Sequence, residues 1–124
     1  MNSFHKLRII SGGQTGADRA ALDFALENKI ACGGWCPSGR LAEDGKIPEK
    51  YPLKEASTVN YPQRTRLNIE DSDGTLIVYL NRFDPGTGLT LGLCKKLNKP
   101  FLIIKVSEPY NTSVLNDWIG KNEI

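Results

Sequence analysis

The stretch that decides the fold is RIISGGQTGADRAALDFALENKIACGGW, residues 8–35. A β-branched apolar run over 6–11 predicts a strand that ends where two glycines follow. Small and apolar residues then recur at helical spacing from 16 to 28, and a second short apolar run covers 30–35. The order strand, glycine turn, helix and strand predicts a βαβ unit.

The start of this first helix carries its own signals. Thr15 is a candidate N-cap, and Asp18 three residues later completes a capping-box pattern. We therefore expect both side chains to hold backbone N–H groups at the N-terminus of the helix.

Length and composition limit the remaining choices. The chain has 124 residues, and we expect residues 1–124 to form a single domain. Its 16 basic and 14 acidic residues give a net charge of +2, which is too balanced to indicate a nucleic-acid or membrane partner. We expect a cytoplasmic protein, because no apolar run approaches the ~20 residues of a membrane span and the first residues lack a signal-peptide stretch.

Cysteine and histidine usage argues against metal and redox chemistry. An odd number of cysteines without a secretion signal predicts reduced thiols at Cys32, Cys36 and Cys94. The first two are four residues apart, which is not the spacing of a zinc or redox motif. Ligation of a soft metal by these thiolates stays an open alternative. The single histidine, His5, lies near the terminus, and we expect no catalytic triad there.

The rest of the chain continues the alternation of helices and strands. Residues 37–62 are interrupted by prolines and glycines, and their apolar residues predict a long ordered loop. The elements expected after it are a helix over 63–71, strands over 75–80 and 101–106, and helices over 89–97 and 112–121. The alternation predicts a Rossmann-like, three-layer α/β fold with a mostly parallel sheet.

Two glycine-rich turns are the candidate binding sites, because ligands of open α/β sheets bind beyond the carboxyl ends of the strands. Glycine lets an oxyanion approach backbone N–H groups, and a helix N-terminus adds partial positive charge. The alternative is that these glycines only allow tight turns between a strand and a helix. Neither turn has the sequence pattern of a dinucleotide-binding loop or of a P-loop. The predicted phosphate-binding loop residues are Gly12, Gly13, Gln14, Thr15, Gly16, Gly86, Thr87, Gly88 and Thr90.

Charged residues beside these turns complicate an anion site. Asp18 would repel a phosphate from the first helical turn. Apart from capping, it could accept a hydrogen bond from a ribose hydroxyl or a pterin N–H. Arg19, Arg40 and Arg64 are the candidate compensating charges, because arginine favours bidentate contacts with oxyanions.

Taken together, these residues resemble the putative molybdenum carrier proteins, which are molybdenum-cofactor carrier-like members of the SLOG superfamily. The opening motif spans 11–23, and the similarity continues through Gly-Gly-Trp-Cys-Pro at 33–37 and Glu-Asp-Gly at 43–45. It covers about residues 7–119. Its further matches are Gly39-Arg40, Ile47-Pro48, Tyr61, Arg64-Thr65, Asn68, 71–77, Gly86-Thr87 and Leu89-Thr90.

The resemblance implies a homo-oligomer that binds the molybdenum cofactor (molybdopterin), or an equivalent nucleotide or free oxyanion, and hands its cargo to molybdoenzymes. The cofactor is a small phosphorylated ligand with a pterin and a molybdenum oxo group, which would suit two anion-holding turns. Binding roles fall on the turn residues, with Arg40 and Arg64 as charge partners. Carrying needs no chemical step, so the expectation favours a binding protein over an enzyme.

Two other functions stay open. SLOG relatives that are nucleoside-monophosphate phosphoribohydrolases carry an Arg nine residues before the Asp of a Ser-Asp pair, a spacing that Arg64 and Asp73 share. Those enzymes place a catalytic Glu soon after the second glycine motif, whereas residues 91–93 here contain no acid. Asp18 or Asp44 would then have to act as the general acid or base for cleavage of the glycosidic bond. A nucleotide-sensing module without turnover is the third possibility.

The sequence also departs from the carrier pattern. Pro85 stands where relatives often have another glycine, and Gly92 stands where an acidic residue is common. The chain ends at Ile124, and we expect it to lack the C-terminal strand with the Val-Ala-Gly-Pro-Arg-type segment of relatives. Part of the pocket would then be lost or supplied by a partner subunit.

Overall fold

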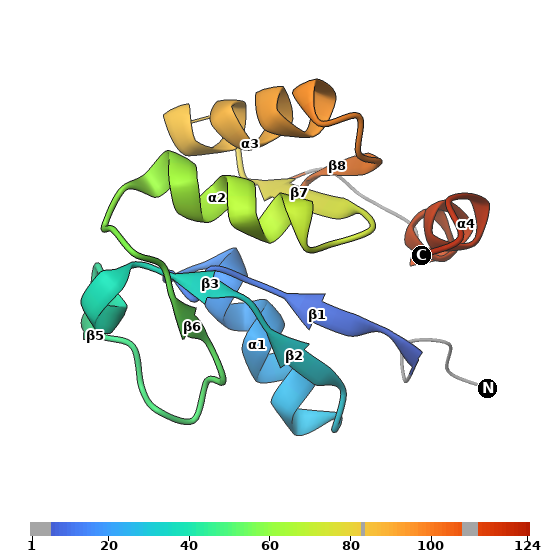
Figure 1. Cartoon of the computed structure of the whole chain (residues 1–124). Coiled ribbons are helices and arrows are strands. Elements are labelled where there is room, and N and C mark those ends of the chain that lie inside the picture. The colour runs from blue at the N-terminus through green and yellow to red at the C-terminus, as the bar shows by residue number, and fades with distance from the viewer. Residues whose placement is uncertain (1–5, 83, 108–111) are drawn as a thin grey trace. The chain divides into compact units, whose positions relative to one another are not determined.

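The computed structural model describes residues 6–82, 84–107 and 112–124 (Figure 1). The chain divides into two compact units, Met1–Asp71 and Ser72–Ile124. Each unit has its own parallel strand pairing and its own packed helix. The expectation of one domain over residues 1–124 stays a prediction.

The first unit opens with the predicted βαβ arrangement. Strand β1 (Arg8–Ile10) pairs in parallel with β2 (Ala31–Gly33), and Ile9 lies opposite Cys32. Helix α1 (Ala17–Glu27) connects them and packs on both strands. Leu22 and Ala25 on its inner face are fully buried.

The predicted capping box at the start of α1 is wrong. The N-cap is Gly16, with φ 86°, and it makes no side-chain capping bond. Glycine adopts this left-handed backbone readily, so the chain enters the helix without a polar cap. The Thr15 hydroxyl instead donates to Glu43 (Oγ1–Oε2 3.2 Å), and Asp18 accepts from the Gln14 amide, which lies outside the helix (3.3 Å).

The long segment after β2 is ordered, as expected, and the structure shows that it packs on α1. Strand β3 (Trp35–Cys36) follows β2 after a break at Gly34 and pairs in parallel with β6 (Lys54–Glu55). Between them lie a 3-10 turn (Ser38–Arg40) and an antiparallel hairpin of β4 (Leu41–Ala42) and β5 (Gly45–Lys46). The hydrophobic core joins both parts, and its buried members are Leu22, Cys36, Ile47 and Tyr51.

Helix α2 (Tyr61–Glu70) closes the first unit and packs on β3 (Figure 1). It begins two residues earlier than predicted, because Asn60 is its N-cap and accepts from the Gln63 amide at 3.2 Å. Proline at residue 62 is tolerated there, since amides of the first helical turn have no partner within the helix.

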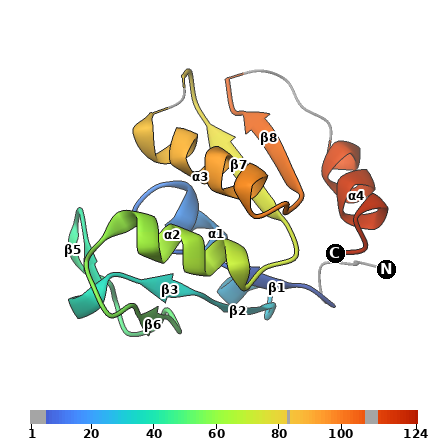
Figure 2. The same ribbon diagram turned by 45° about the horizontal axis from the view of Figure 1, so that its top comes forward.

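The second unit is built on two five-residue parallel strands. Strand β7 (Thr75–Tyr79) pairs with β8 (Phe101–Lys105), and helix α3 (Pro85–Lys96) packs on β7 (Figure 2). Helix α4 (Thr112–Lys121) ends the chain. Gly74, just before β7, lies against Trp118 and Ile124 and leaves no room for a side chain.

The second glycine turn is helical, which corrects the prediction of a loop before residue 89. Helix α3 starts at Pro85, and the preceding Asp84 is the N-cap, accepting from the Thr87 amide at 2.7 Å. Gly86, Thr87 and Gly88 therefore lie in the first turn of the helix.

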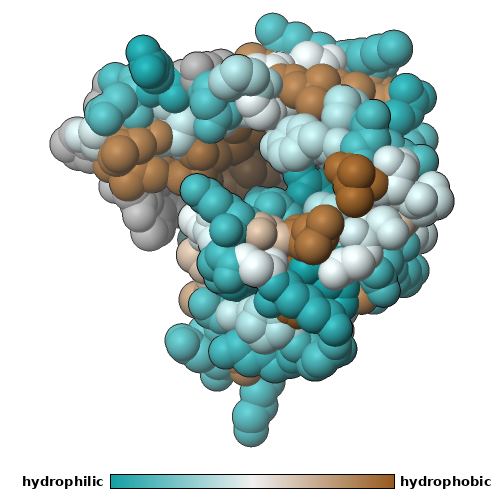
Figure 3. Space-filling model, turned by 90° about the vertical axis from the view of Figure 1, so that its left-hand side faces the viewer, coloured by the Kyte–Doolittle hydropathy of each residue, from teal (hydrophilic) through white to brown (hydrophobic). Residues whose placement is uncertain are grey.

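On the face drawn in Figure 3 hydrophilic residues predominate, and hydrophobic residues gather in a brown patch toward the upper left, with a few others among polar residues. In the described part of the chain, no helix has the length and apolar character needed to cross a membrane. Exposed large hydrophobic side chains of the first unit include Phe24, Leu26, Leu41, Val59 and Tyr61.

Candidate functional site

Three polar side chains from two helices meet beside Gly12, at the end of β1. A Cβ built on Gly12 would lie 3.0 Å from Asp18 Oδ2, 3.5 Å from Asn68 Nδ2 and 3.6 Å from Arg64 Cζ. Asp18 comes from the first turn of α1, and the other two lie one turn apart on α2. We call these four residues the Gly12 cluster.

Arg64 is the unusual member of the cluster. The residue is only 4% exposed, and its guanidinium lies over the Tyr61 ring, with 4.3 Å between Cζ and the ring centroid. Among the described residues, nothing accepts a hydrogen bond from it and no carboxylate pairs with it. A guanidinium has five N–H donors, and leaving buried donors unpaired is costly.

The unused donors of Arg64 open toward accessible space. Within the described part of the chain, every fully buried side-chain nitrogen and oxygen has a hydrogen-bond partner. The unpartnered guanidinium nitrogens must therefore keep some contact with solvent. A buried cation with reachable donors is suited to an oxyanion that approaches from outside.

Asp18 is the acidic member of the Gly12 cluster. Its Oδ2 accepts from the Gln14 amide at 3.3 Å. Burial raises the pKa of Asp18, and this effect outweighs the Gln14 hydrogen bond and the positive charges of Arg64 and Arg19, which lower it. No ion pair joins Asp18 to an arginine among the described residues.

The amides of the first glycine turn are partly used within the protein. The Gly13 amide donates to Ser11 Oγ at 3.2 Å, and the Gln14 amide donates to Asp18. The Gln14 side chain donates to the Leu41 carbonyl at 3.0 Å and so ties the turn to the β4–β5 hairpin. An oxyanion here would depend on Arg64 more than on these two amides, which the sequence prediction did not anticipate.

The second turn already holds a negative charge. The Asp84 carboxylate accepts from the Thr87 amide, and this hydrogen bond holds the pKa of Asp84 below its usual value. The Thr90 hydroxyl donates to the Gly86 carbonyl at 3.0 Å. The binding roles of Gly86, Thr87, Gly88 and Thr90 stay predictions.

Arg19 and Arg40 differ from Arg64 because each is engaged by the protein itself. Arg19 donates to the Gly13 carbonyl (3.1 Å) and makes a bidentate pair with Asp44 (3.0 and 3.2 Å). This pair lowers the pKa of Asp44, which disfavours Asp44 as a proton donor.

Arg40 organises the segment around it. The residue is 8% exposed and donates to four backbone carbonyls at 2.8–3.3 Å. One N–H is left over, so a role as charge partner for a ligand stays a prediction beside this internal role. The accepting carbonyls belong to Ile47, Pro48, Tyr51 and Leu53.

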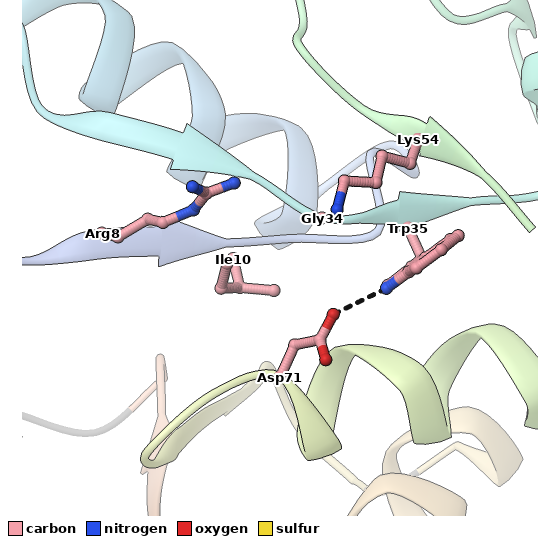
Figure 4. Close-up of a pocket in the computed structure, with 6 residues that line it drawn as sticks. All are labelled: Arg8, Ile10, Gly34, Trp35, Lys54 and Asp71. Atoms are coloured by element: carbon pink, nitrogen blue, oxygen red, sulfur yellow. Dashed lines mark hydrogen bonds between the residues drawn. The ribbon is translucent and has the colours of Figure 1, made fainter.

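A cavity of about 260 Å³ lies in the same unit, near the other end of α2 (Figure 4). The Trp35 indole N–H donates to Asp71 Oδ2 at 2.8 Å, and Lys54 Nζ lies 5.3 Å from the centre of the Trp35 ring. Sequence reasoning missed this cavity because its residues are far apart in the chain. Its lining residues are Arg8, Ile10, Gly34, Trp35, Lys54 and Asp71.

Asn68 links the cavity to the Gly12 cluster. Its Oδ1 accepts from the Trp35 amide at 2.7 Å, and its Nδ2 donates to the Trp35 carbonyl at 3.1 Å. Asn68 was not among the predicted site residues, although it lies four residues after Arg64. The four-residue spacing on α2 was the signal that could have found it.

The three cysteines are free thiols, and burial raises the pKa of each. Over residues 6–82, 84–107 and 112–124, no group of three or more His, Cys, Asp and Glu side chains is placed to hold a metal ion. The open alternative of metal ligation by the thiolates gains no support from this arrangement.

The family model described as the circularly permutated YpsA SLOG family matches residues 9–124. The chain belongs to this family. A crystal structure of a putative molybdenum carrier protein from Syntrophus aciditrophicus SB is similar to this chain, with a TM-score of 0.91 and 46% sequence identity over 94% of this chain and 76% of that one. No curated protein matches. The expected resemblance and the mixed α/β fold class with parallel strand pairs are confirmed for this SLOG protein.

Replacing Asp18 with Asn is expected to stabilise the ligand-free protein at pH 7 by up to about 1 kcal/mol, the scale of a single polar substitution. Burial raises the pKa of Asp18, so the folded state holds this proton more tightly than the unfolded chain. The contribution is present at low pH and is lost as pH rises through the folded pKa. Asn keeps an acceptor for the Gln14 amide without the buried charge.

Urea unfolding of the wild type and of Asp18→Asn at pH 4 and pH 7 measures this difference in the free energy of unfolding. The gap in favour of Asp18→Asn should widen toward pH 7. A variant less stable than the wild type at pH 7 would mean that the attraction of Arg64 and Arg19 outweighs the burial of the carboxylate.

Proposed function

We propose that this SLOG protein binds and carries a small phosphorylated ligand at the Gly12 cluster, and that the ligand is the molybdenum cofactor or a closely related oxyanion compound. One observation carries the proposal. Arg64 is buried and has no hydrogen-bond acceptor among the described residues. A phosphate or oxo oxygen would supply the acceptor that the guanidinium lacks.

The family supports the choice of cargo. The relative from Syntrophus aciditrophicus is named a putative molybdenum carrier protein, and 46% identity over 94% of this chain makes a shared ligand class a reasonable proposal. Homo-oligomer formation and delivery to molybdoenzymes are proposals that follow from the family resemblance, and a cytoplasmic location is a proposal that follows from the sequence.

The residues of the cluster fit the phosphorylated part of such a ligand. Arg64 offers planar donors that match a phosphate, and Gly12 has no side chain to obstruct the approach. Asp18 and the Asn68 amide provide hydrogen-bonding groups close to the same point. Binding and release need no bond to be made or broken, so we propose a carrier rather than an enzyme.

Replacing Arg64 with Gln is expected to weaken ligand binding about 10- to 100-fold, because charge-assisted hydrogen bonds contribute about 1.5–3 kcal/mol. Calorimetric titration and thermal shift with the molybdenum cofactor and with AMP measure the effect. A ligand at about 100 times its Kd should add about 2.7 kcal/mol to wild-type stability.

Arg66→Gln is the matched control. Arg66 lies on the same helix, is half exposed and pairs with Glu70 (3.5 Å), so its loss should leave binding unchanged. Equal affinity in Arg64→Gln and the wild type would contradict the site. The absence of any stabilisation of the wild type by both ligands would contradict the proposed function. Release of free base from AMP that disappears in Arg64→Gln would support the phosphoribohydrolase alternative instead.

A further inference from the structure

The two charged members of the Gly12 cluster lie close to the same point beside Gly12. Asp18 Oδ2 lies 3.0 Å and Arg64 Cζ lies 3.6 Å from the position of an absent Cβ on Gly12. They make no ion pair with each other, so neither neutralises its neighbour by direct contact. Any oxyanion that pairs with Arg64 therefore enters the field of the Asp18 carboxylate.

No ion pair and no hydrogen bond among the described residues requires the negative charge of Asp18. Its carboxylate makes one hydrogen bond, at 3.3 Å from the Gln14 amide, and a neutral Asn could accept the same bond. The neighbouring Arg19 points to Asp44 instead. The carboxylate thus stands half-buried with unused acceptor capacity.

An ionised carboxylate can only accept hydrogen bonds. Next to a bound anion it repels a bare oxygen, but it attracts an oxygen or nitrogen that carries a proton. Arg64 alone would bind any oxyanion. With Asp18 beside Arg64, the ligand must also carry a hydrogen-bond donor next to its own negative charge.

We propose that the Gly12 cluster selects ligands in which an oxyanion, paired with Arg64, stands beside an O–H or N–H group that donates to Asp18. This inference rests on the proposed function and specifies its ligand class. Hydrogen phosphate and phosphate esters with a neighbouring hydroxyl or N–H meet the requirement. Sulfate and free molybdate carry no proton near neutral pH and do not, so the cluster takes molybdenum only as part of a larger donor-bearing compound.

Inorganic phosphate and sulfate are a direct pair of probes. At about pH 8 both are predominantly tetrahedral dianions, because inorganic phosphate has by then lost two of the three protons of phosphoric acid, yet phosphate retains one O–H. The two anions then have the same charge and nearly the same size. They differ in that phosphate carries a hydrogen-bond donor and sulfate does not. Thermal-shift titration of the full chain with each anion measures the two affinities.

The wild type is expected to bind phosphate at least about 10-fold more tightly than sulfate, the ratio that corresponds to one charge-assisted hydrogen bond. Asp18→Asn should reduce this ratio to near one, mainly by gaining affinity for sulfate, because the Asn amide can donate where the carboxylate repelled. Glu27→Gln is the control, since it removes an exposed negative charge from the same helix and should leave the ratio unchanged.

The outcomes separate this inference from the proposed function. Equal binding of both anions to the wild type, or an unchanged ratio in Asp18→Asn, would overturn selection by Asp18 and leave the carrier proposal standing. If neither phosphate nor the molybdenum cofactor stabilises the wild type, the proposed function is overturned and this inference with it. A restored preference in Asp18→Glu would support the role of the carboxylate.

Discussion

Replacing Gly34 with Ala is expected to lower the free energy of unfolding by at least about 3 kcal/mol, because two costs add at this position. Gly34 has φ +136°, a conformation that residues with a side chain rarely adopt. A Cβ there would also lie 2.1 Å from the Ser11 carbonyl oxygen and 2.8 Å from the Ser11 nitrogen. These backbone atoms are held in place, since the Ser11 amide donates to the Gly33 carbonyl at 2.9 Å.

Urea denaturation of Gly34→Ala and the wild type measures the loss. Gly92→Ala is the contrasting control, because Gly92 lies within helix α3 and an added Cβ meets no atom within 4 Å. That change should stabilise the protein by up to about 1 kcal/mol, since alanine is the better helix former. A Gly34→Ala protein with wild-type stability would mean that the β2–β3 junction is not built as described.

Replacing Arg40 with Met is expected to destabilise the protein by about 3 kcal/mol or more. The buried guanidinium donates to four carbonyls of residues 47–53, and Met leaves these acceptors without a partner. The segment also contributes Ile47 and Tyr51 to the core, so its loosening would expose apolar surface. Arg40→Lys should recover only part of the loss, because a compact ammonium cannot span four acceptors.

Arg66→Met is the matched control for this change. Its side chain is 46% exposed and makes one surface ion pair, so the expected loss is within about 0.5 kcal/mol. Thermal and urea unfolding compare the three variants. An Arg40→Met protein as stable as Arg66→Met would contradict the role of Arg40 as the organiser of this segment.

Local patterns predicted the regular elements well. Helical spacing placed α1, apolar runs placed β7 and β8, and α4 has the predicted bounds. The start of α3 was missed because Pro85 and the two glycines after it are typical of loops. The structure uses the proline as a first helical residue behind the Asp84 cap, a combination that satisfies the helix N-terminus.

The site depended on contacts that no local pattern contains. Arg19, Arg40 and Arg64 were all candidates in the sequence, with Arg40 and Arg64 preferred as charge partners, and their hydrogen-bond partners in the fold single out Arg64. The capping role expected of Asp18 failed because the positive φ of Gly16 gives the helix a different entry. The cavity beside Trp35 could not be predicted, since it is assembled from strands and a helix end distant in sequence.

The Gly12 cluster explains why a carrier would retain two groups that are costly to bury. Arg64 without an acceptor and Asp18 with a burial-raised pKa both weaken the ligand-free fold, and both become useful when an oxyanion with a neighbouring donor is bound. Stability lost at a site and recovered on binding is common at functional positions.

A crystal structure of the protein with its phosphorylated ligand tests binding at the Gly12 cluster most directly. We expect a ligand oxygen at about 3 Å from a guanidinium nitrogen of Arg64, and a donor of the ligand facing Asp18. A ligand bound elsewhere, with the Arg64 guanidinium still without an acceptor, would contradict it.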